Sequence, residues 1–316
     1  MSFVKNIGVA VLFTALFTTC GYGQLAGTPG AFSRIGFGAR GMGMGNSLTA
    51  VRSGELNGYY NPAVIPFQRV RDISISYGIL SLDRYHNSLF FTQPLDTNAA
   101  VSLSVLNSGV KEIDGRDIDG FHTENYSTSE NLFSLSFGLR IRKIAVGLTT
   151  KIIYNSLFKD LSSTSVGFDV GFLLPLSERF TVAAAIKDIN SKYSWETSSL
   201  YGQLGNSTTE KFPVRKIVGI SYLVDESSAL LSGELEMTNR SVTIVRFGGE
   251  AALSEYLSVR AGIDGWNTTD SQQAHPSFGL TVKSGLTHFT PALNYAYVVE
   301  PYGLFVIHVV SLSVVL

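Results

Sequence analysis

The sequence predicts an all-β protein, a transmembrane antiparallel β-barrel of about fourteen strands with a short N-terminal hatch segment in the lumen. Three observations predict this fold: apolar residues at every second position from residue 70 onward, long strands, and connections that alternate between short and long. Successive side chains of a strand point to opposite faces, so a period of two is typical of strands. Helical spacing is nearly absent after residue 70.

The composition excludes several classes of function. Charged residues make up 16% of the chain, against roughly 25% in an average soluble domain, which disfavours an ordinary cytosolic enzyme. The 24 Lys and Arg against 25 Asp and Glu give a net charge of −1, so there is no basic field for nucleic acid. A single Cys excludes a disulfide framework and a cysteine-rich metal site.

Residues 1–23 are predicted to be a secretory signal peptide. Lys5 gives a positive start, and the apolar stretch from Ile7 to Thr19 is too short to span a membrane. Cleavage before Gln24 would remove Cys20. The alternative, a lipoprotein anchored at Cys20, lacks the small residues that usually precede such a cysteine. In both cases the protein leaves the cytoplasm.

Residues 70–316 are predicted to form the barrel. Between Phe133 and Arg142, large apolar residues alternate with smaller or polar ones such as Ser134 and Ser136. The predicted strands cover residues 71–80, 84–93, 98–108, 131–142, 143–157, 162–175, 178–190, 213–224, 228–238, 241–253, 256–266, 274–285, 287–298 and 303–315. Most reach the roughly 9–11 residues that a tilted strand needs to cross the hydrocarbon layer, whereas globular strands average about 5–6 residues.

The connections between these strands indicate the orientation in a bacterial outer membrane. Such barrels have short periplasmic turns and long outer loops in alternation. The predicted long connections are Gly109 to Glu130, Leu157 to Leu161, Ser191 to Phe212 and Asn267 to Gln273, and all follow odd-numbered strands. Even-numbered strands lead into tight turns such as Arg142-Lys143. Both termini are therefore expected on the periplasmic side.

Two further groups of side chains are assigned from their positions on the predicted strands. The outer strand ends carry five aromatic residues that suit an interfacial belt: Tyr85, Tyr154, Tyr193, Trp195 and Trp266. The lumen is expected to receive the charges of Arg140, Arg142, Asp169, Glu234, Glu236, Arg260 and Lys283. Mutual pairing and solvation explain these charges better than a specific site for a charged solute.

Residues 24–69 break the strand pattern and are predicted to form a hatch or plug inside the barrel. The hatch residues that we single out are Gly41, Gly43, Gly45, Asn61, Pro62 and Ala63. The glycines allow a close approach of backbone to the barrel wall, and Pro62 restricts Asn61 to extended conformations. The alternative is a flexible periplasmic tether, which the apolar residues between Met42 and Val51 disfavour.

Two stretches of this segment resemble a known family. GARGMGMGNSLTAV (Gly38 to Val51) and YYNPA (Tyr59 to Ala63) resemble the N-terminal signature of the PorV/PorQ-like outer-membrane proteins, which belong with the FadL-like long-chain fatty-acid transporter barrels. The segment GGEAALSEYLSVRAGID (Gly248 to Asp264) is similar to part of their closing hairpins. The resemblance implies fourteen strands and a periplasmic hatch inserted into the lumen. Members include hydrophobic-compound channels and subunits of the type IX secretion machinery.

No catalytic, cofactor or metal site is predicted. GFGARG (Gly36 to Gly41) matches the dinucleotide-binding glycine pattern, but no βαβ unit surrounds it. The five histidines have no short spacing typical of metal ligands. A barrel phospholipase would need a Ser and a His that meet in space, and no motif indicates one. We expect a non-enzymatic protein without a cofactor, and the ligand contacts stay unassigned.

Three functions remain open on this basis. We favour a passive conduit for hydrophobic small molecules across the outer membrane. The second is a type IX secretion accessory barrel that binds exported proteins at the cell surface through its long outer loops, and the third is a structural barrel that anchors other envelope proteins. The expected partners are outer-membrane lipid, the barrel-assembly machinery during insertion, and either hydrophobic small molecules or secretion-system components.

Overall fold

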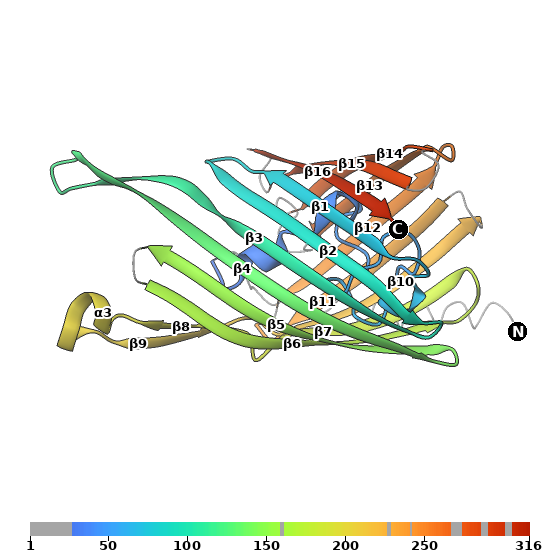
Figure 1. The fold of residues 1–316 in the computed structure, drawn as a ribbon, viewed down its shortest axis with the longest axis horizontal. Coiled ribbons are helices and arrows are strands. Elements are labelled where there is room, and N and C mark those ends of the chain that lie inside the picture. Colours follow the sequence, from blue (N-terminus) through green and yellow to red (C-terminus); the bar gives the residue numbers. More distant parts are fainter. Residues whose placement is uncertain are drawn as a thin grey trace, which may run out of the picture.

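The computed structural model describes residues 27–158, 161–225, 229–240, 242–266, 274–285, 290–300 and 305–316. The signal peptide, Cys20 and the loop predicted at residues 267–273 lie outside these ranges. No helix within the described ranges is both long and apolar enough to span a bilayer. Antiparallel strands make up most of the described chain and close into a barrel (Figure 1).

Fourteen strands form the barrel wall, which confirms the predicted fold class. They are β1 (Asp72–Ile79), β2 (Arg84–Asp96), β3 (Ala99–Arg116), β4 (His122–Ile141), β5 (Ile144–Phe158), β6 (Leu161–Pro175), β7 (Phe180–Ile189), β10 (Arg215–Asp225), β11 (Ala229–Thr238), β12 (Thr243–Ala252), β13 (Leu257–Trp266), β14 (His275–Lys283), β15 (Thr290–Val299) and β16 (Val306–Val315). Each wall strand pairs with its neighbour in the chain, and β7 pairs with β10. Pairing of β1 with β16 closes the barrel.

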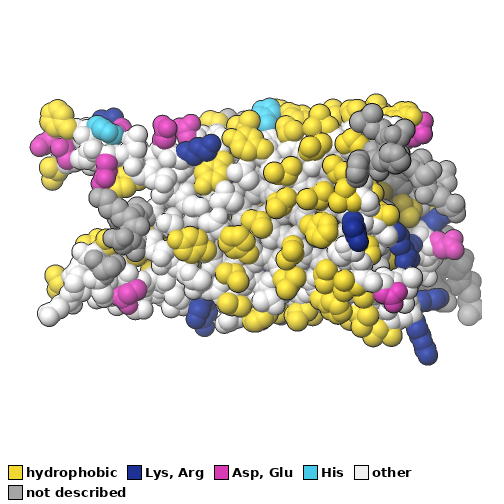
Figure 2. Space-filling model, in the orientation of Figure 1, with side chains coloured by type: hydrophobic (Ala, Val, Ile, Leu, Met, Phe, Trp, Pro, Cys, Tyr) yellow, Lys and Arg dark blue, Asp and Glu magenta, His cyan; other side chains and the backbone are white. Residues whose placement is uncertain are grey.

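The two faces of the wall differ as the period of two predicts. On β4 the side chain of Phe137 is 47% exposed, whereas Ser136 is fully buried. On β11, Leu231 faces outward and Glu236 is buried. Figure 2 shows apolar side chains spread over the outside of the barrel. A lipid-facing apolar surface around a polar interior is the arrangement expected of an outer-membrane barrel.

Two connections that were predicted as long loops contain strands, so these predictions were wrong in part. The ladder between β3 and β4 continues to the pair Arg116 and His122. The second connection contains β8 (Lys192–Glu196), α3 (Ser198–Tyr201), η3 (Gly202–Leu204) and β9 (Ser207–Lys211). Both hairpins project from one end of the barrel, which we call the long-loop end, opposite the short-turn end (Figure 1). Beyond the membrane both faces of a strand meet water, so polar composition there does not separate strand from loop.

The predicted aromatic belt is wrong for two of its members. Tyr193 and Trp195 lie on β8 and are only 4% and 9% exposed. Their rings pack together with centroids 5.4 Å apart, and Tyr193 also packs edge-on against Phe212 at 4.8 Å. Trp266 and Tyr154 are 43% and 40% exposed. These two have the exposure that an interfacial position requires.

Most of residues 27–71 lie inside the barrel, and we call this stretch the lumenal segment (Figure 1). The segment contains the short helices η1 (Ala31–Arg34), α2 (Gly38–Gly43) and η2 (Ile65–Phe67). At the long-loop end, Gly30 lies against the ring of Phe212. At the short-turn end, the Arg52 guanidinium donates to the carbonyl oxygens of Ser177 (3.2 Å) and Glu178 in the β6–β7 turn. The segment therefore extends along the length of the lumen.

Candidate functional site

The stretch of residues 61–63 rests on three glycines that lie side by side in the wall. Gly138 of β4 pairs with Gly147 of β5, which pairs with Gly171 of β6. We call them the β4–β6 glycine patch. A Cβ atom on Gly147 or Gly171 would overlap atoms of residues 61–63. The close approach of the lumenal segment therefore requires residues without side chains in the wall.

Asn61 holds this stretch in its local shape. Its Nδ2 donates to the carbonyl of Thr49 at 2.9 Å, and its Oδ1 accepts from the amide of Ala63 at 2.9 Å. Asn61 and Ala63 are both fully buried. The Asn61 amide also donates to the carbonyl of Phe172 on β6 at 3.3 Å. One side chain thus joins two parts of the lumenal segment to the wall.

A second glycine patch receives the other end of the predicted hatch motif. Gly248 of β12 pairs with Gly262 of β13, and Gly279 of β14 lies close by; we call these the β12–β14 glycine patch. A Cβ atom on Gly43 would lie 3.3 Å from the Cα of Gly279. Gly45 has a φ of +58°, and a Cβ atom there would lie 2.6 Å from the amide nitrogen of residue 263. Here glycine is needed on both surfaces.

Gly41 differs from the other hatch glycines because it packs within the lumenal segment. A Cβ atom on Gly41 would overlap the phenol of Tyr60. The Tyr60 hydroxyl donates to Asn46 Oδ1 at 2.8 Å and accepts from the Phe37 amide at 3.0 Å. Burial raises the pKa of Tyr60 well above its usual range, so this hydroxyl stays a donor. The segment is therefore internally tied as well as tied to the wall.

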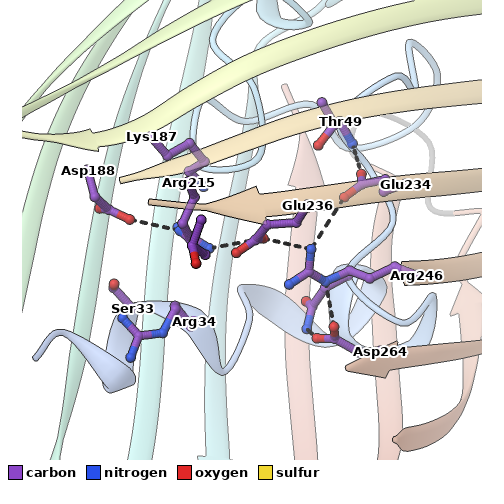
Figure 3. Close-up of polar contacts among 12 residues, drawn as sticks. Ser33, Arg34, Thr49, Lys187, Asp188, Arg215, Glu234, Glu236, Arg246 and Asp264 are labelled. Atoms are coloured by element: carbon purple, nitrogen blue, oxygen red, sulfur yellow. Dashed lines mark hydrogen bonds and ion pairs between the residues drawn. The ribbon is translucent and has the colours of Figure 1, made fainter. Parts of the chain in front are cut away.

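Charged side chains form a buried network between the lumenal segment and strands β5 to β13 (Figure 3). On the wall, Lys151 contacts Asp169 at 2.5 Å and Asp188 at 2.6 Å. Asp188 also accepts from Arg215 Nε at 2.8 Å. The Arg215 guanidinium lies 3.7 Å from Glu236. The network continues from Glu236 to Arg246 (2.8 Å) and from there to Asp264 (2.5 Å), as Figure 3 shows.

Asp264, the neighbouring Lys187, and Glu234, which lies 3.9 Å from the Arg246 guanidinium, contact the lumenal segment directly. Glu234 accepts from the backbone amide of Thr49 at 2.5 Å. Asp264 accepts from Asn46 Nδ2 at 2.8 Å. The Lys187 ammonium donates to the carbonyl of Tyr59 and lies 4.3 Å from the centre of the Tyr59 ring. Because buried charges are costly unless paired, each of these contacts fixes the position of the lumenal segment.

The prediction of lumenal charges was right for four residues and wrong for two. Asp169, Glu234, Glu236 and Arg260 are buried in the lumen. Arg142 and Lys283 are exposed at the short-turn end, because they lie at or next to turns, where the alternation of faces ends. Arg140 is half-buried at the same end and bonds to Asn98. The buried charges that the sequence analysis missed are Arg40, Asp72, Lys151, Lys187, Asp188, Arg215, Arg246 and Asp264. It also missed Glu250, the half-buried partner of Arg40.

An aromatic cluster occupies the lumen between η1 and the β8–β9 hairpin. Its rings are those of Phe32, Phe37, Tyr59, Tyr60, Phe90, Tyr193, Trp195 and Phe212. Phe37 lies 4.9 Å from Tyr59 and 6.2 Å from Phe90 between ring centroids. Barrel lumens are usually polar, so this cluster gives part of the lumen an apolar character.

Three small cavities lie in the described part of the lumen. One of about 10 Å³ lies beside Arg40 and Leu56, a second of about 10 Å³ beside Lys151 and Asp188, and a third of about 20 Å³ beside Arg34 and Glu236. Each has room for about one water molecule and not for an organic solute. An organic solute that passes through the lumen at these cavities must displace part of the lumenal segment.

Metal-binding geometry is absent among the residues that the structure describes, since no three His, Cys, Asp or Glu side chains converge there. His86 is buried at 2% exposure and contacts Ser108 Oγ at 2.6 Å. Its Nε2 lies 2.9 Å from the carbonyl oxygen of Gly36 and donates to it. This histidine therefore helps to position the lumenal segment.

Comparison with known proteins finds the fold in solved structures only. No protein-family profile and no curated protein matches the sequence. The chain is similar to the CymD monoaromatic hydrocarbon channel, with 12% identity, a TM-score of 0.62 and coverage of 89% of this chain and 96% of that chain. It is similar to the P. putida toluene transporter TodX, with 12% identity, a TM-score of 0.65 and coverage of 89% and 99%.

A Pseudomonas aeruginosa FadL homologue is a third similar structure, with 12% identity, a TM-score of 0.59 and coverage of 88% of this chain and 97% of that chain. At this identity the likeness shows a shared fold. The chain therefore has the fold of FadL-like outer-membrane barrels.

Proposed function

We propose that this chain is a passive conduit for hydrophobic small molecules across the bacterial outer membrane, gated by its lumenal segment. The observation that carries the proposal is the aromatic cluster towards the long-loop end of the lumen. Rings such as Phe37, Tyr59 and Phe212 offer a favourable surface to an apolar solute that enters from the long-loop end. The solved structures with the same fold include proteins named as hydrocarbon channels, which supports the same solute class.

The gating role rests on the contacts of the lumenal segment. The segment meets glycine patches on two parts of the wall, and its charged contacts reach Glu234, Glu250 and Asp264. The cavities beside it hold about one water molecule each. We propose that the residues singled out in the sequence, Gly43, Gly45 and Asn61 among them, serve to seat this plug. We also propose that the chain belongs to the PorV/PorQ-like group.

The experiment is uptake of a labelled monoaromatic compound, such as toluene, by intact cells that express the protein. We expect faster initial uptake than in cells with an empty vector, and no acceleration for a sugar. Phe212→Ala, which removes a ring from the aromatic cluster, should slow uptake severalfold at low solute concentration. Phe121→Ala is the matched control because Phe121 is 72% exposed in the β3–β4 turn.

Uptake of toluene equal to that of the empty-vector cells would overturn the conduit. Equal effects of Phe212→Ala and Phe121→Ala on uptake would mean that the aromatic cluster does not line the route of the solute. The secretion role that the sequence analysis kept as an alternative has no observation in its favour, since the similar folds are named as channels and transporters.

A further inference from the structure

Two guanidinium groups converge on one carbonyl oxygen at the short-turn end of the barrel. Arg69 at the end of the lumenal segment donates through Nη1 to the carbonyl of Thr97 at 3.1 Å. Arg140 of β4 donates through Nη2 to the same oxygen at 3.2 Å, and also bonds to Asn98 Oδ1 at 2.9 Å. Two like charges on one acceptor repel each other, and an anion bound between them would offset this repulsion.

Two further cations lie in the next turn along the wall. Arg142 and Lys143 form the turn between β4 and β5, and both are exposed. No ion pair joins Arg69, Arg140, Arg142 or Lys143 to a carboxylate in the part of the chain that the structure describes. Asp96 is an acidic residue at the end of β2, and its carboxylate accepts from the Thr97 amide at 2.6 Å. The sector therefore has an excess of positive charge.

These four cations border the lipid-facing surface. Ile141, Ile144 and Leu95 beside them are 59%, 43% and 57% exposed, and they continue the apolar outer face of β2, β4 and β5. Figure 2 shows Lys and Arg side chains at this end of the barrel, next to the apolar surface. A molecule that fits both surfaces has an acyl chain for the apolar side and a phosphate for the guanidinium groups.

From this arrangement we infer that Arg69, Arg140, Arg142 and Lys143 form a binding site for the headgroup of an anionic phospholipid in the inner leaflet of the outer membrane. Short turns of outer-membrane barrels face the periplasm, which places these cations at the phospholipid leaflet. Arginine forks bind phosphate oxygens in a bidentate manner, and the lysine adds a point charge. The site is independent of the proposed conduit.

The experiment is native mass spectrometry of the detergent-solubilised protein titrated with dioctanoyl phosphatidylglycerol, and in parallel with dioctanoyl phosphatidylcholine. We expect the anionic lipid to bind at least about tenfold more tightly than the zwitterionic one. The double variant Arg142→Gln/Lys143→Gln should weaken binding of the anionic lipid about 25-fold, because each cation near an anionic lipid surface contributes roughly fivefold to the affinity. Neither side chain holds the fold through a hydrogen bond in the described chain.

The matched control is Lys211→Gln/Arg240→Gln, which removes the same two charge types at the long-loop end, where both residues are exposed. This variant should bind the anionic lipid as the unmodified chain does. An equal loss in the control would show a long-range charge effect and overturn the site. Equal affinity for the two lipids would also overturn it. Displacement of the lipid by inorganic phosphate at equal concentration would show a phosphate site without lipid specificity and overturn the lipid assignment.

Discussion

Arg40 and Glu250 join the lumenal segment to the barrel wall through two parallel hydrogen bonds. Arg40 Nε lies 3.0 Å from Glu250 Oε2, and Arg40 Nη2 lies 3.1 Å from Oε1. Arg40 belongs to α2 and Glu250 to β12, so the contact spans 210 residues of chain. Arg260 of β13 contacts the same carboxylate at 2.5 Å. This three-residue group is the strongest single attachment of α2 that the structure describes.

Arg40→Gln should loosen the lumenal segment more than it disturbs the wall. Breaking a buried ion pair costs about 3–5 kcal/mol, and we expect the lower value because Arg260 still neutralises Glu250. The measurement is the urea midpoint of unfolding, together with the conductance of the reconstituted protein, which should rise. The matched control is Arg116→Gln, which breaks the exposed pair with Asp114 and should cost less than about 1 kcal/mol. Equal effects of the two variants would contradict a role of Arg40 in holding the segment.

Gly171→Ala tests the β4–β6 glycine patch. The added methyl group would overlap Asn61 Oδ1, and overpacking of this kind costs about 1–3 kcal/mol. We expect a lower unfolding midpoint and faster proteolysis of the lumenal segment. Gly233→Ala is the control, because its methyl group would meet the Phe247 ring at 3.6 Å and Ile220 at 3.8 Å, both ordinary contact distances, and alanine is favoured over glycine in a strand interior. Unchanged proteolysis of the Gly171→Ala protein would mean that the segment does not depend on this contact.

The two faces of β4 should respond differently to an arginine. Phe137→Arg places a charge on the lipid side, at a cost of roughly 2–4 kcal/mol near the midplane, and should reduce the amount of assembled barrel. Ser136→Arg leaves the lipid face intact, but Ser136 is fully buried and lies against Gly58 of the lumenal segment. We expect that variant to assemble and to conduct more, because the new side chain displaces the segment. Assembly yield on unheated gels and conductance separate the two outcomes. Equal assembly yields would mean that the lipid and lumen faces of β4 are wrongly assigned, and a lower yield for Ser136→Arg than for Phe137→Arg would mean that they are inverted.

The sequence predicts the wall well because lipid and lumen impose opposite polarities on alternate residues. The alternation fails where this contrast ends. On β7, Lys187 and Asp188 both face the lumen because Asp169 of β6 opposes the two of them in a bulge. A strict period of two places one of them on the lipid side, which explains why Lys187 and Asp188 were missed.

The hatch motif is visible in the sequence, whereas the wall positions that receive it are not. Gly43, Gly45 and Asn61 stand out because they lie in one compact, glycine-rich stretch. Their partners in the wall are single glycines on different strands, such as Gly147 and Gly171, which meet only through the pairing of β5 with β6. Each of these strand glycines fits the smaller, polar half of its own alternation. The register of the closed sheet is needed to show that they form a patch.

Removal of residues 36–66 is the most direct test of the plug. This deletion takes out α2 and residues 61–63, and with them the contacts to both glycine patches. A fourteen-stranded wall encloses more space than its own side chains fill, so we expect a large rise in single-channel conductance for small ions. The wall strands keep their pairing partners, and the deleted protein should still migrate differently in boiled and unboiled gel samples.

Two outcomes decide what the deletion means. A folded deletion protein with high conductance that also lets a sugar pass would show that the lumenal segment seals the barrel. A folded deletion protein with unchanged conductance would refute the plug, because the lumen would then be closed by the wall and its projecting hairpins alone. The buried Glu234 and the half-buried Glu250 lose their partners Thr49 and Arg40 in this protein, so its unfolding midpoint should fall even if the barrel closes normally.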